Sequence, residues 1–395
     1  MYNINYSKNI ENKLPIDNLI FRINELNDNS KKNIVFIKDF FDTSTFRYRA
    51  YNVCQTLKKS TKYRGVCFLV EELKRLYNLL DKIDLVILQR CKWSVELDSF
   101  INYCKSNHVK LIYDIDDLIY DLNYLPNYIS SIGDYTDSSV NTLFALSGLY
   151  NKVMRSCDSF IVSTENLKKN VLKDFKKKVY HFNNYLNLEQ EQVSEKICIQ
   201  KNNVYDSSKF VIGYFSGSGT HERDFKIAIY SIIDLMEKYD NICLKIVGYM
   251  VLPDECRKYI INRRIEIIPL VSYIDLQYLI GSVDLNIVPL QTSEFNACKS
   301  ELKFFEASIV NTLSLVSTNN VYDKIITDGV NGFICTENEW YSKMEYIYLN
   351  YDKLNKKITK KAKDFCLKKY SNHNQLQMLE KIFDEILRGE RNEIL

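Results

Sequence analysis

Short apolar segments alternate with amphipathic segments through most of the chain, and this pattern restricts the folds open to it. Residues 33–38, 66–70 and 84–90 are apolar without the polar–apolar alternation of a strand that faces water on one side. Each is followed by a stretch with helical spacing. Strands covered by helices on both faces have this pattern, so the sequence predicts α/β architecture with doubly wound, Rossmann-like parallel sheets.

The alternation lapses once, near residues 183–209, and then restarts. A chain of 395 residues fits two domains better than one. We therefore expect two doubly wound domains facing an interdomain cleft, with C-terminal helices packing back on the first domain. The predicted parts are an N-terminal extension at 1–30, a first domain at 31–190, a linker at 191–208, a second domain at 209–370 and a crossing C-terminal helix at 371–395.

Composition excludes several classes of function. The 53 basic and 50 acidic residues nearly balance, which argues against a nucleic-acid partner. The N-terminal segment has no signal-peptide character, no apolar run is long enough to span a membrane, and the eleven cysteines form no CxxC pair. These features predict a cytoplasmic protein with free thiols and no metal. Basic clusters at 58–64 and 168–178 are interpreted as solvated faces, with contact to the anionic inner face of the membrane as the alternative.

A glycine cluster follows the first predicted strand of the second domain. Gly213, Gly217 and Gly219 match neither GxGxxG nor a Walker loop, but they make a small-residue turn where backbone can approach a ligand. Arg223 lies at the start of the next predicted helix, where a phosphate can bind. A plain tight turn with a surface arginine explains the same residues, and His221 fits a surface position.

A second candidate segment spans residues 296–312, after a predicted buried strand. Within a helix predicted at 299–310, Lys299, Lys303 and Glu306 would share one face. Two ammonium groups suit a diphosphate and one carboxylate suits a pair of sugar hydroxyls. A solvated helix face with a Lys–Glu pair is the alternative interpretation.

Charged residues also follow the predicted strands of the first domain. Arg47 and Arg49 come after the first strand, and Asp114, Asp116 and Asp117 end the fourth. The arginines would face the cleft and an anionic acceptor, or else lie in water. The aspartates would bind Mg²⁺ or Mn²⁺, or anchor a loop.

The second domain resembles the nucleotide-sugar domain of a GT-B glycosyltransferase of the retaining family four. The match holds in order along most of that domain, and it consists of IGYFSGSGTHERDF (212–225), LKIVG (244–248), the segment 272–290, KFFEAS (303–308) with LSLVST (313–318), and DGVNGFI (328–334). In the first domain, RYRAYN (47–52) and YDIDDL (113–118) are similar to a bacterial subgroup that builds surface polysaccharides. Two departures are Cys298, which stands in place of the first of the family's two glutamates, and Ser216–Gly217, which replaces the usual Gly-Arg.

The resemblance implies retaining transfer from a nucleotide diphosphate sugar to a glycan, lipid-linked or protein acceptor, without a metal cofactor. Arg223 and Lys303 would neutralise the leaving diphosphate and Glu306 would hold the ribose. The donor-binding residues would be Gly217, Ser218, Gly219, Thr220, His221, Asn296, Ala297, Cys298 and Lys299. Arg47, Arg49, Asp114, Asp116 and Asp117 would lie on the acceptor side. A nucleotide-sugar epimerase and a non-catalytic sugar-binding member of a glycosylation complex remain alternatives.

Overall fold

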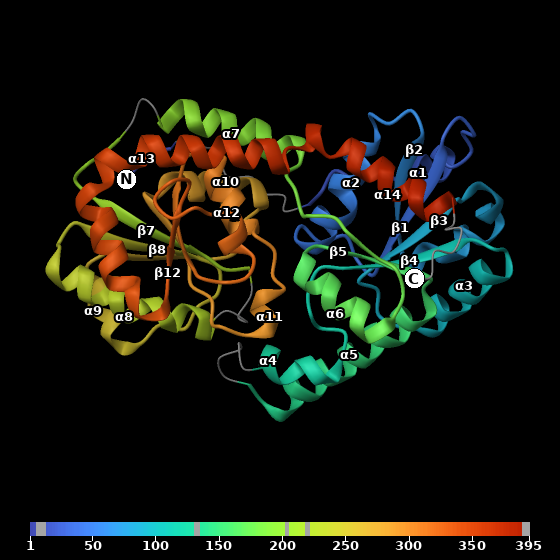
Figure 1. The fold of residues 1–395 in the computed structure, drawn as a ribbon, viewed down its shortest axis with the longest axis horizontal. Coiled ribbons are helices and arrows are strands. Elements are labelled where there is room, and N and C mark those ends of the chain that lie inside the picture. Colours follow the sequence, from blue (N-terminus) through green and yellow to red (C-terminus); the bar gives the residue numbers. More distant parts are fainter. Residues whose placement is uncertain (5–12, 130–134, 202–204, 218–221, 389–395) are drawn as a thin grey trace.

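The computed structural model describes residues 1–4, 13–129, 135–201, 205–217 and 222–388. In this part of the chain, two six-stranded sheets form two domains that lie side by side (Figure 1). Their strand orders are β2-β1-β3-β4-β5-β6 and β12-β11-β10-β7-β8-β9, and every pairing of neighbouring strands is parallel. The predicted architecture of two doubly wound parallel sheets is confirmed.

The first domain carries short apolar strands, each followed by a helix or a helical turn. Its strands are β1 (Lys32–Lys38), β2 (Tyr63–Leu69), β3 (Leu85–Gln89), β4 (Lys110–Ile115), β5 (Ser159–Val162) and β6 (Val179–His181). Its helices are α1 (Leu19–Glu25), η1 (Arg47–Tyr51), α2 (Asn52–Leu57), η2 (Val70–Arg75), η3 (Tyr77–Lys82), α3 (Val95–Ser106), η4 (Leu122–Tyr124), α4 (Leu125–Ile129), α5 (Asp137–Ser156) and α6 (Glu165–Phe175).

The second domain repeats the plan. Its strands are β7 (Phe210–Phe215), β8 (Ile242–Val247), β9 (Ile265–Ile268), β10 (Leu285–Val288), β11 (Leu313–Ser317) and β12 (Phe333–Cys335). Its helices are α7 (Leu188–Lys201), α8 (Glu222–Lys238), η6 (Asp254–Cys256), α9 (Arg257–Ile261), α10 (Tyr273–Ser282), α11 (Glu294–Ala297), α12 (Leu302–Ser308), η7 (Tyr322–Lys324), η8 (Glu337–Glu339) and α13 (Trp340–Tyr370). The chain ends, within the described residues, with η9 (Asn372–Asn374) and α14 (Leu376–Arg388).

The segment predicted as a linker at 191–208 contains most of α7. This helix packs on α10 of the second domain. It also lies beside α13 (Figure 1), where the Lys363 ammonium donates to the Cys198 Sγ at 3.1 Å. The link between the domains is therefore the short stretch 182–187, between β6 and α7.

The C-terminal helices return to the first domain, as predicted. The 31-residue α13 runs without a break from the second domain toward the first (Figure 1). Helix α14 then packs against α2, and its Phe383 ring lies 5.5 Å from the ring of Tyr63 at the start of β2. The predicted basic clusters help to hold it, because Lys62 pairs with Asp384 at 3.3 Å and Lys178 with Glu385 at 3.9 Å.

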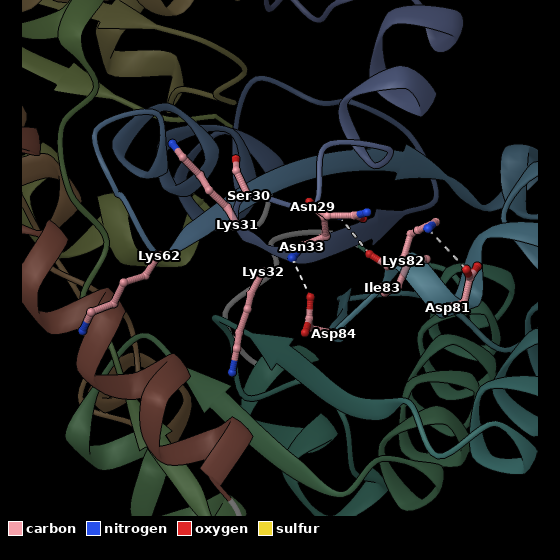
Figure 2. Close-up of a pocket in the computed structure, with 10 residues that line it drawn as sticks. All are labelled: Asn29, Ser30, Lys31, Lys32, Asn33, Lys62, Asp81, Lys82, Ile83 and Asp84. Atoms are coloured by element: carbon pink, nitrogen blue, oxygen red, sulfur yellow. Dashed lines mark hydrogen bonds and ion pairs between the residues drawn. The ribbon is translucent and has the colours of Figure 1, made fainter.

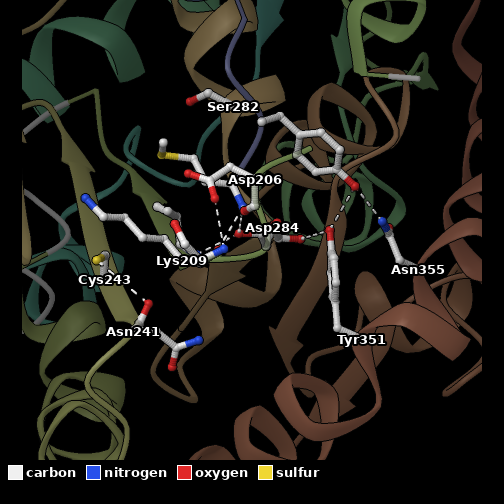
Figure 3. A network of polar contacts seen from close by, with 12 residues as sticks. Asp206, Lys209, Asn241, Cys243, Ser282, Asp284, Tyr351 and Asn355 are labelled. Carbon is white, nitrogen blue, oxygen red and sulfur yellow. Dashed lines mark hydrogen bonds and ion pairs between the residues drawn. The ribbon is translucent and has the colours of Figure 1, made fainter. Parts of the chain in front are cut away.

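The start of the chain lies on the second domain, in the network shown in Figure 3. The Met1 amine lies 3.1 Å from the buried carboxylate of Asp284, which also accepts the Val211 N–H at 2.7 Å. Burial raises the pKa of this carboxyl, and the nearby amine opposes the effect. Asn355 on α13 donates to the Tyr2 hydroxyl at 2.7 Å. The N-terminal segment thus joins the amino end of β10 to α13.

Candidate functional site

Helix α12 brings Lys303 and Glu306 to the carboxyl ends of the second-domain strands. Phe304, Phe305 and Ala307 are fully buried, and they fix the helix by packing it into the core. The i,i+3 spacing places Lys303 and Glu306 on the opposite, shared side. Ligands bind at this end of doubly wound sheets. The expected helix at 299–310 is shorter in the structure, because α12 begins at Leu302 and leaves Lys299 in the preceding turn.

Lys303 carries a buried ammonium group beside the end of β7. Among the described residues, its ammonium group makes no hydrogen bond, and it lies 4.9 Å from the centroid of the Tyr214 ring at the end of β7. Burial, followed by the nearby Lys299, lowers the pKa of Lys303 to about 8, while Asp224 and Glu306 act in the opposite direction. An ammonium in this setting has unused donors that an anion can accept.

Asp224, in the first turn of α8, is a site residue that the sequence analysis missed. Its carboxylate is fully buried, accepts the Gln291 N–H and the Asn296 amide at 2.9 Å each, and lies 3.7 Å from the Lys299 ammonium. Burial lowers the pKa of Lys299 and Asp224 raises it. The charge of Lys299 is therefore compensated inside the protein, unlike that of Lys303. In the sequence, the signal that could have identified Asp224 was its position directly after Arg223.

The loop after β7 lies against the end of β8. Gly248 has φ of +107°, and a Cβ there would come within 1.8 Å of the Ser216 carbonyl oxygen, so only glycine permits this approach. Gly217 is exposed, with nothing within 4 Å of an added Cβ. Arg223 is half-buried at the start of α8. The predicted donor residues Ser218, Gly219, Thr220 and His221 lie outside the described residues.

Glu306 joins the two domains. Its Oε1 accepts a hydrogen bond from the Tyr48 hydroxyl and lies 3.7 Å from the Arg47 Nη2 atom, both from η1 of the first domain. The Arg47 guanidinium lies between the Tyr48 and Tyr273 rings, 4.1 and 4.5 Å from their centroids. The alternative that Arg47 lies in water is wrong, since the residue is buried. The carboxylate predicted to hold a ribose is thus covered by first-domain side chains.

The turn between α11 and α12 lies against α6 of the first domain. Thr164 donates to the Cys298 carbonyl at 2.9 Å and Asn166 to the Ala297 carbonyl at 2.8 Å. The Asn170 amide lies 3.4 Å from the Cys298 Sγ. The N–H groups of Ala297, Cys298 and Lys299 are bonded within the α11 turn. Backbone donors predicted to meet the sugar phosphate are therefore already engaged in this structure.

Glu301, the residue before α12, was also missed by the sequence analysis. It is buried and accepts hydrogen bonds from the Asn183 amide, at 3.1 Å, and from the Tyr370 hydroxyl, with Lys369 at 3.6 Å. Asn183 belongs to the link between the domains, and Tyr370 ends α13. One carboxylate therefore ties α12 to both places where the chain passes between the domains.

On the first domain, the predicted acceptor residues separate into two groups. Arg49 and Asp114 form a fully buried ion pair at 2.7 Å, and Arg49 also donates to the Phe182 carbonyl at 2.6 Å, so the alternative of a solvated Arg49 is wrong. Asp116 and Asp117 lie 3.5 and 3.2 Å from Arg90.

The second group lies near the donor side. Burial, followed by the adjacent Asp117, raises the pKa of Asp116 to about 6. The Asp117 charge also raises the pKa of Lys299, on the second domain. Among the described residues, no three His, Cys, Asp or Glu side chains group closely enough to hold a metal ion.

A cavity of about 280 Å³ lies at the opposite end of the first sheet, beside the amino ends of β1 and β3. Lys31, Lys32, Lys62 and Lys82 surround it, and Figure 2 shows the first three pointing in different directions rather than toward one point. Asp81 lies 3.5 Å from Lys82. This cavity is separate from the residues of the candidate site. No described helix is long and apolar enough to cross a bilayer.

Comparison with solved structures identifies the fold. The sequence matches no protein-family model and no curated protein sequence. A solved glycosyltransferase from Rickettsia africae is similar, with 14% identity, a TM-score of 0.63 and 91% of this chain and 100% of that chain covered. The sucrose-phosphate synthase of Thermosynechococcus elongatus gives 10% identity, a TM-score of 0.61 and coverage of 91% and 100%.

The HepE protein of Anabaena, solved with UDP and glucose, gives 12% identity, a TM-score of 0.58 and coverage of 89% and 99%. HepE has also been solved in complexes with UDP and with UDP-glucose. These likenesses extend over both sheets and establish a GT-B fold.

Proposed function

We propose that the chain is a retaining glycosyltransferase. It transfers a sugar from a nucleotide diphosphate sugar to a glycan, lipid-linked or protein acceptor in the synthesis of bacterial surface polysaccharides or glycoconjugates. The GT-B fold and the UDP and UDP-glucose complexes of HepE support a nucleotide-sugar substrate. The eleven free thiols fit a reducing compartment, and we propose a cytoplasmic protein that contacts the inner face of the membrane peripherally.

The observation that carries this proposal is the buried Lys303 ammonium, which has no hydrogen-bond partner within the described part of the chain. It is buried at the carboxyl end of β7, where doubly wound sheets bind their ligands. A diphosphate would supply the acceptor oxygens that this group lacks and would compensate its charge. Neighbouring Lys299 is held by Asp224, so Lys303 is the cation ready for a ligand.

Each proposed role follows from position. Lys303 and Arg223 stabilise the negative charge that develops on the leaving diphosphate. Glu306 holds the ribose hydroxyls after exchanging its hydrogen bond with Tyr48 for one with the nucleotide. Contact between α6 and the α11–α12 turn excludes water from the reacting sugar. These side chains provide the neutralising charge, and a metal is not part of the proposal.

Thermal unfolding with UDP, GDP and ADP tests the donor site. One of the three is expected to raise the unfolding midpoint, because a ligand of the folded state stabilises it. Lys303→Ala is expected to lose this rise, whereas Lys226→Ala, at an exposed position of α8, retains it. A full rise in the Lys303 variant would contradict the assignment.

The reaction itself needs a second measurement. Incubation with the stabilising nucleotide's sugar conjugates, followed by product analysis, should show nucleoside diphosphate release and a transferred sugar with the anomeric configuration of the donor. An epimerised nucleotide sugar would favour the epimerase alternative. Binding without any turnover over a broad acceptor panel would favour the non-catalytic alternative.

A further inference from the structure

We propose that Cys54 and Cys67 form a dithiol that hydrogen peroxide converts to an intramolecular disulfide. Both cysteines are free thiols in the structure, and their Sγ atoms are 3.3 Å apart. Cys54 lies on α2 and is half-buried, while Cys67 lies on β2 and is buried. The other nine cysteines are all buried.

The sequence of β2 explains why the two sulfurs meet. Gly65 and Cys67 are two residues apart on the strand, so they face the same side of the sheet, the side that α2 covers. A Cβ on Gly65 would lie 2.8 Å from the Cys54 Sγ and 3.1 Å from the Cys54 Cα. The absence of a side chain at Gly65 therefore lets the α2 backbone approach the strand and places the Cys54 sulfur beside Cys67.

Little movement separates this contact from a covalent bond. A disulfide has an S–S distance of about 2.0 Å, so the sulfurs have to approach by roughly 1.3 Å. Rotation of the cysteine side chains about their Cα–Cβ bonds is the movement by which the two sulfurs would close this distance. The disulfide would tie α2 to β2, and α2 directly continues η1, which carries Tyr48 and Arg47 to Glu306.

The chemistry balances with peroxide as the oxidant. The more accessible Cys54, as thiolate, attacks one peroxide oxygen, and the O–O bond breaks to leave a sulfenic acid and, after protonation, water. Cys67 then attacks the Cys54 sulfur, the S–S bond forms, and the hydroxyl leaves as a second water. Two thiols lose two electrons and two protons, and one peroxide is reduced to two waters.

The environment of the pair sets its pH dependence. Burial raises the pKa of the Cys54 thiol, and its hydrogen bond with Cys67 adds to this effect. Glu25 on α1 acts in the same direction, whereas Lys58, next to α2, opposes it. Since the thiolate is the attacking species, the rate of oxidation should rise about tenfold for each pH unit between neutral and alkaline pH.

Intact-protein mass spectrometry tests the proposal without a nucleotide or an acceptor. The full chain is treated with hydrogen peroxide, denatured and alkylated. Two fewer alkylated thiols than the eleven of the reduced protein are expected. After trypsin, the cross-link should join the peptides 50–58 and 65–74, and dithiothreitol should release them.

Three variants complete the experiment. Cys54→Ser should keep every remaining thiol alkylatable, whereas Cys243→Ser, which changes a distant cysteine on β8, should still lose two. Gly65→Ala should separate α2 from β2 and prevent the cross-link. The proposal is overturned if peroxide leaves all eleven thiols of the unmodified protein alkylatable, if it first joins another pair, or if Cys54→Ser still loses two.

Discussion

Replacing Lys303 by methionine should stabilise the unliganded protein. The native side chain buries an ammonium without a hydrogen-bond partner among the described residues. Burial, together with the Lys299 charge, lowers the pKa of Lys303 from 10.5 to about 8, and one pKa unit is worth about 1.4 kcal/mol. The charged form therefore destabilises the folded protein by roughly 3 kcal/mol. Methionine keeps an apolar contact with the Tyr214 ring and removes the charge.

The sign of the pH dependence follows from the lowered pKa. Below about pH 8 the lysine is protonated in both the folded and the unfolded state, so the full advantage of methionine should be present at pH 7. Between about pH 8 and 10.5 the folded state loses its proton first and is relieved of the penalty. The difference in the free energy of unfolding between the two proteins should therefore shrink as pH rises through this window.

Denaturant unfolding at pH 7 and at pH 9.5, with Lys226→Met as the exposed control, measures this difference. With the stabilising nucleotide bound at pH 7, the native protein should become more stable than Lys303→Met. The nucleotide compensates the charge of Lys303 in the native protein, whereas methionine offers it no such contact. A Lys303→Met protein that is less stable than the native protein at pH 7 would refute the argument, since the ammonium would then have a stabilising partner.

Three further substitutions test the packing around the site. Gly248→Ala should destabilise the protein by several kcal/mol in denaturant unfolding, because the new Cβ would overlap the Ser216 carbonyl at a backbone φ of +107°. The control is Gly148→Ala, in open space on α5, which should be neutral or stabilising by about 0.5–1 kcal/mol. Arg49→Met should lower the free energy of unfolding by about 3–5 kcal/mol, because it leaves the buried Asp114 carboxylate unpaired. The double variant Arg49→Met with Asp114→Leu should recover part of that loss, and an equal loss in the single and the double variant would contradict the ion-pair account. Tyr48→Phe should lower the free energy of unfolding by about 1–3 kcal/mol, because it removes a hydrogen-bond donor from Glu306. An unchanged unfolding midpoint would show that this hydrogen bond between the domains is broken in solution.

The sequence predicted the strands well, because strands buried on both faces leave a local signal. The apolar segments 33–38, 66–70 and 84–90 fall on β1, on most of β2 and on β3. Local composition is sufficient where burial on a sheet requires runs of Val, Ile and Leu.

Helix α7 shows where local composition fails. Its buried positions include Gln190, Ser194 and Lys201, which look solvent-facing in the sequence. Lys201 is satisfied by the Asn311 carbonyl and the Thr312 hydroxyl, at 2.9 and 3.0 Å, from a segment far along the chain. The partners that make a polar helix stable in the interior are tertiary contacts, and the sequence of α7 alone does not contain them.

The candidate site was predicted in part for the same reason. Lys303 and Glu306 share a helix face as expected, but Lys299 lies off the helix and beside Asp224, a residue distant in sequence. The contact of Glu306 with Tyr48 and the contacts of Glu301 with Asn183 and Tyr370 depend on how the two domains meet. A pattern within one segment does not specify a relation between two domains.

The chain ends are exchanged between the halves of the molecule, and this limits how it can be dissected. Met1 and Tyr2 lie on the second domain, while α14 covers α2 of the first. A recombinant fragment cut between β6 and α7 would leave the first half with an uncovered apolar face on α2 and the second half without the Met1 amine that pairs with Asp284. A separable first half needs α14 fused behind β6, and a separable second half needs the first four residues supplied in trans. Gene fragments that ignore this exchange should yield insoluble halves, even though each contains a complete sheet.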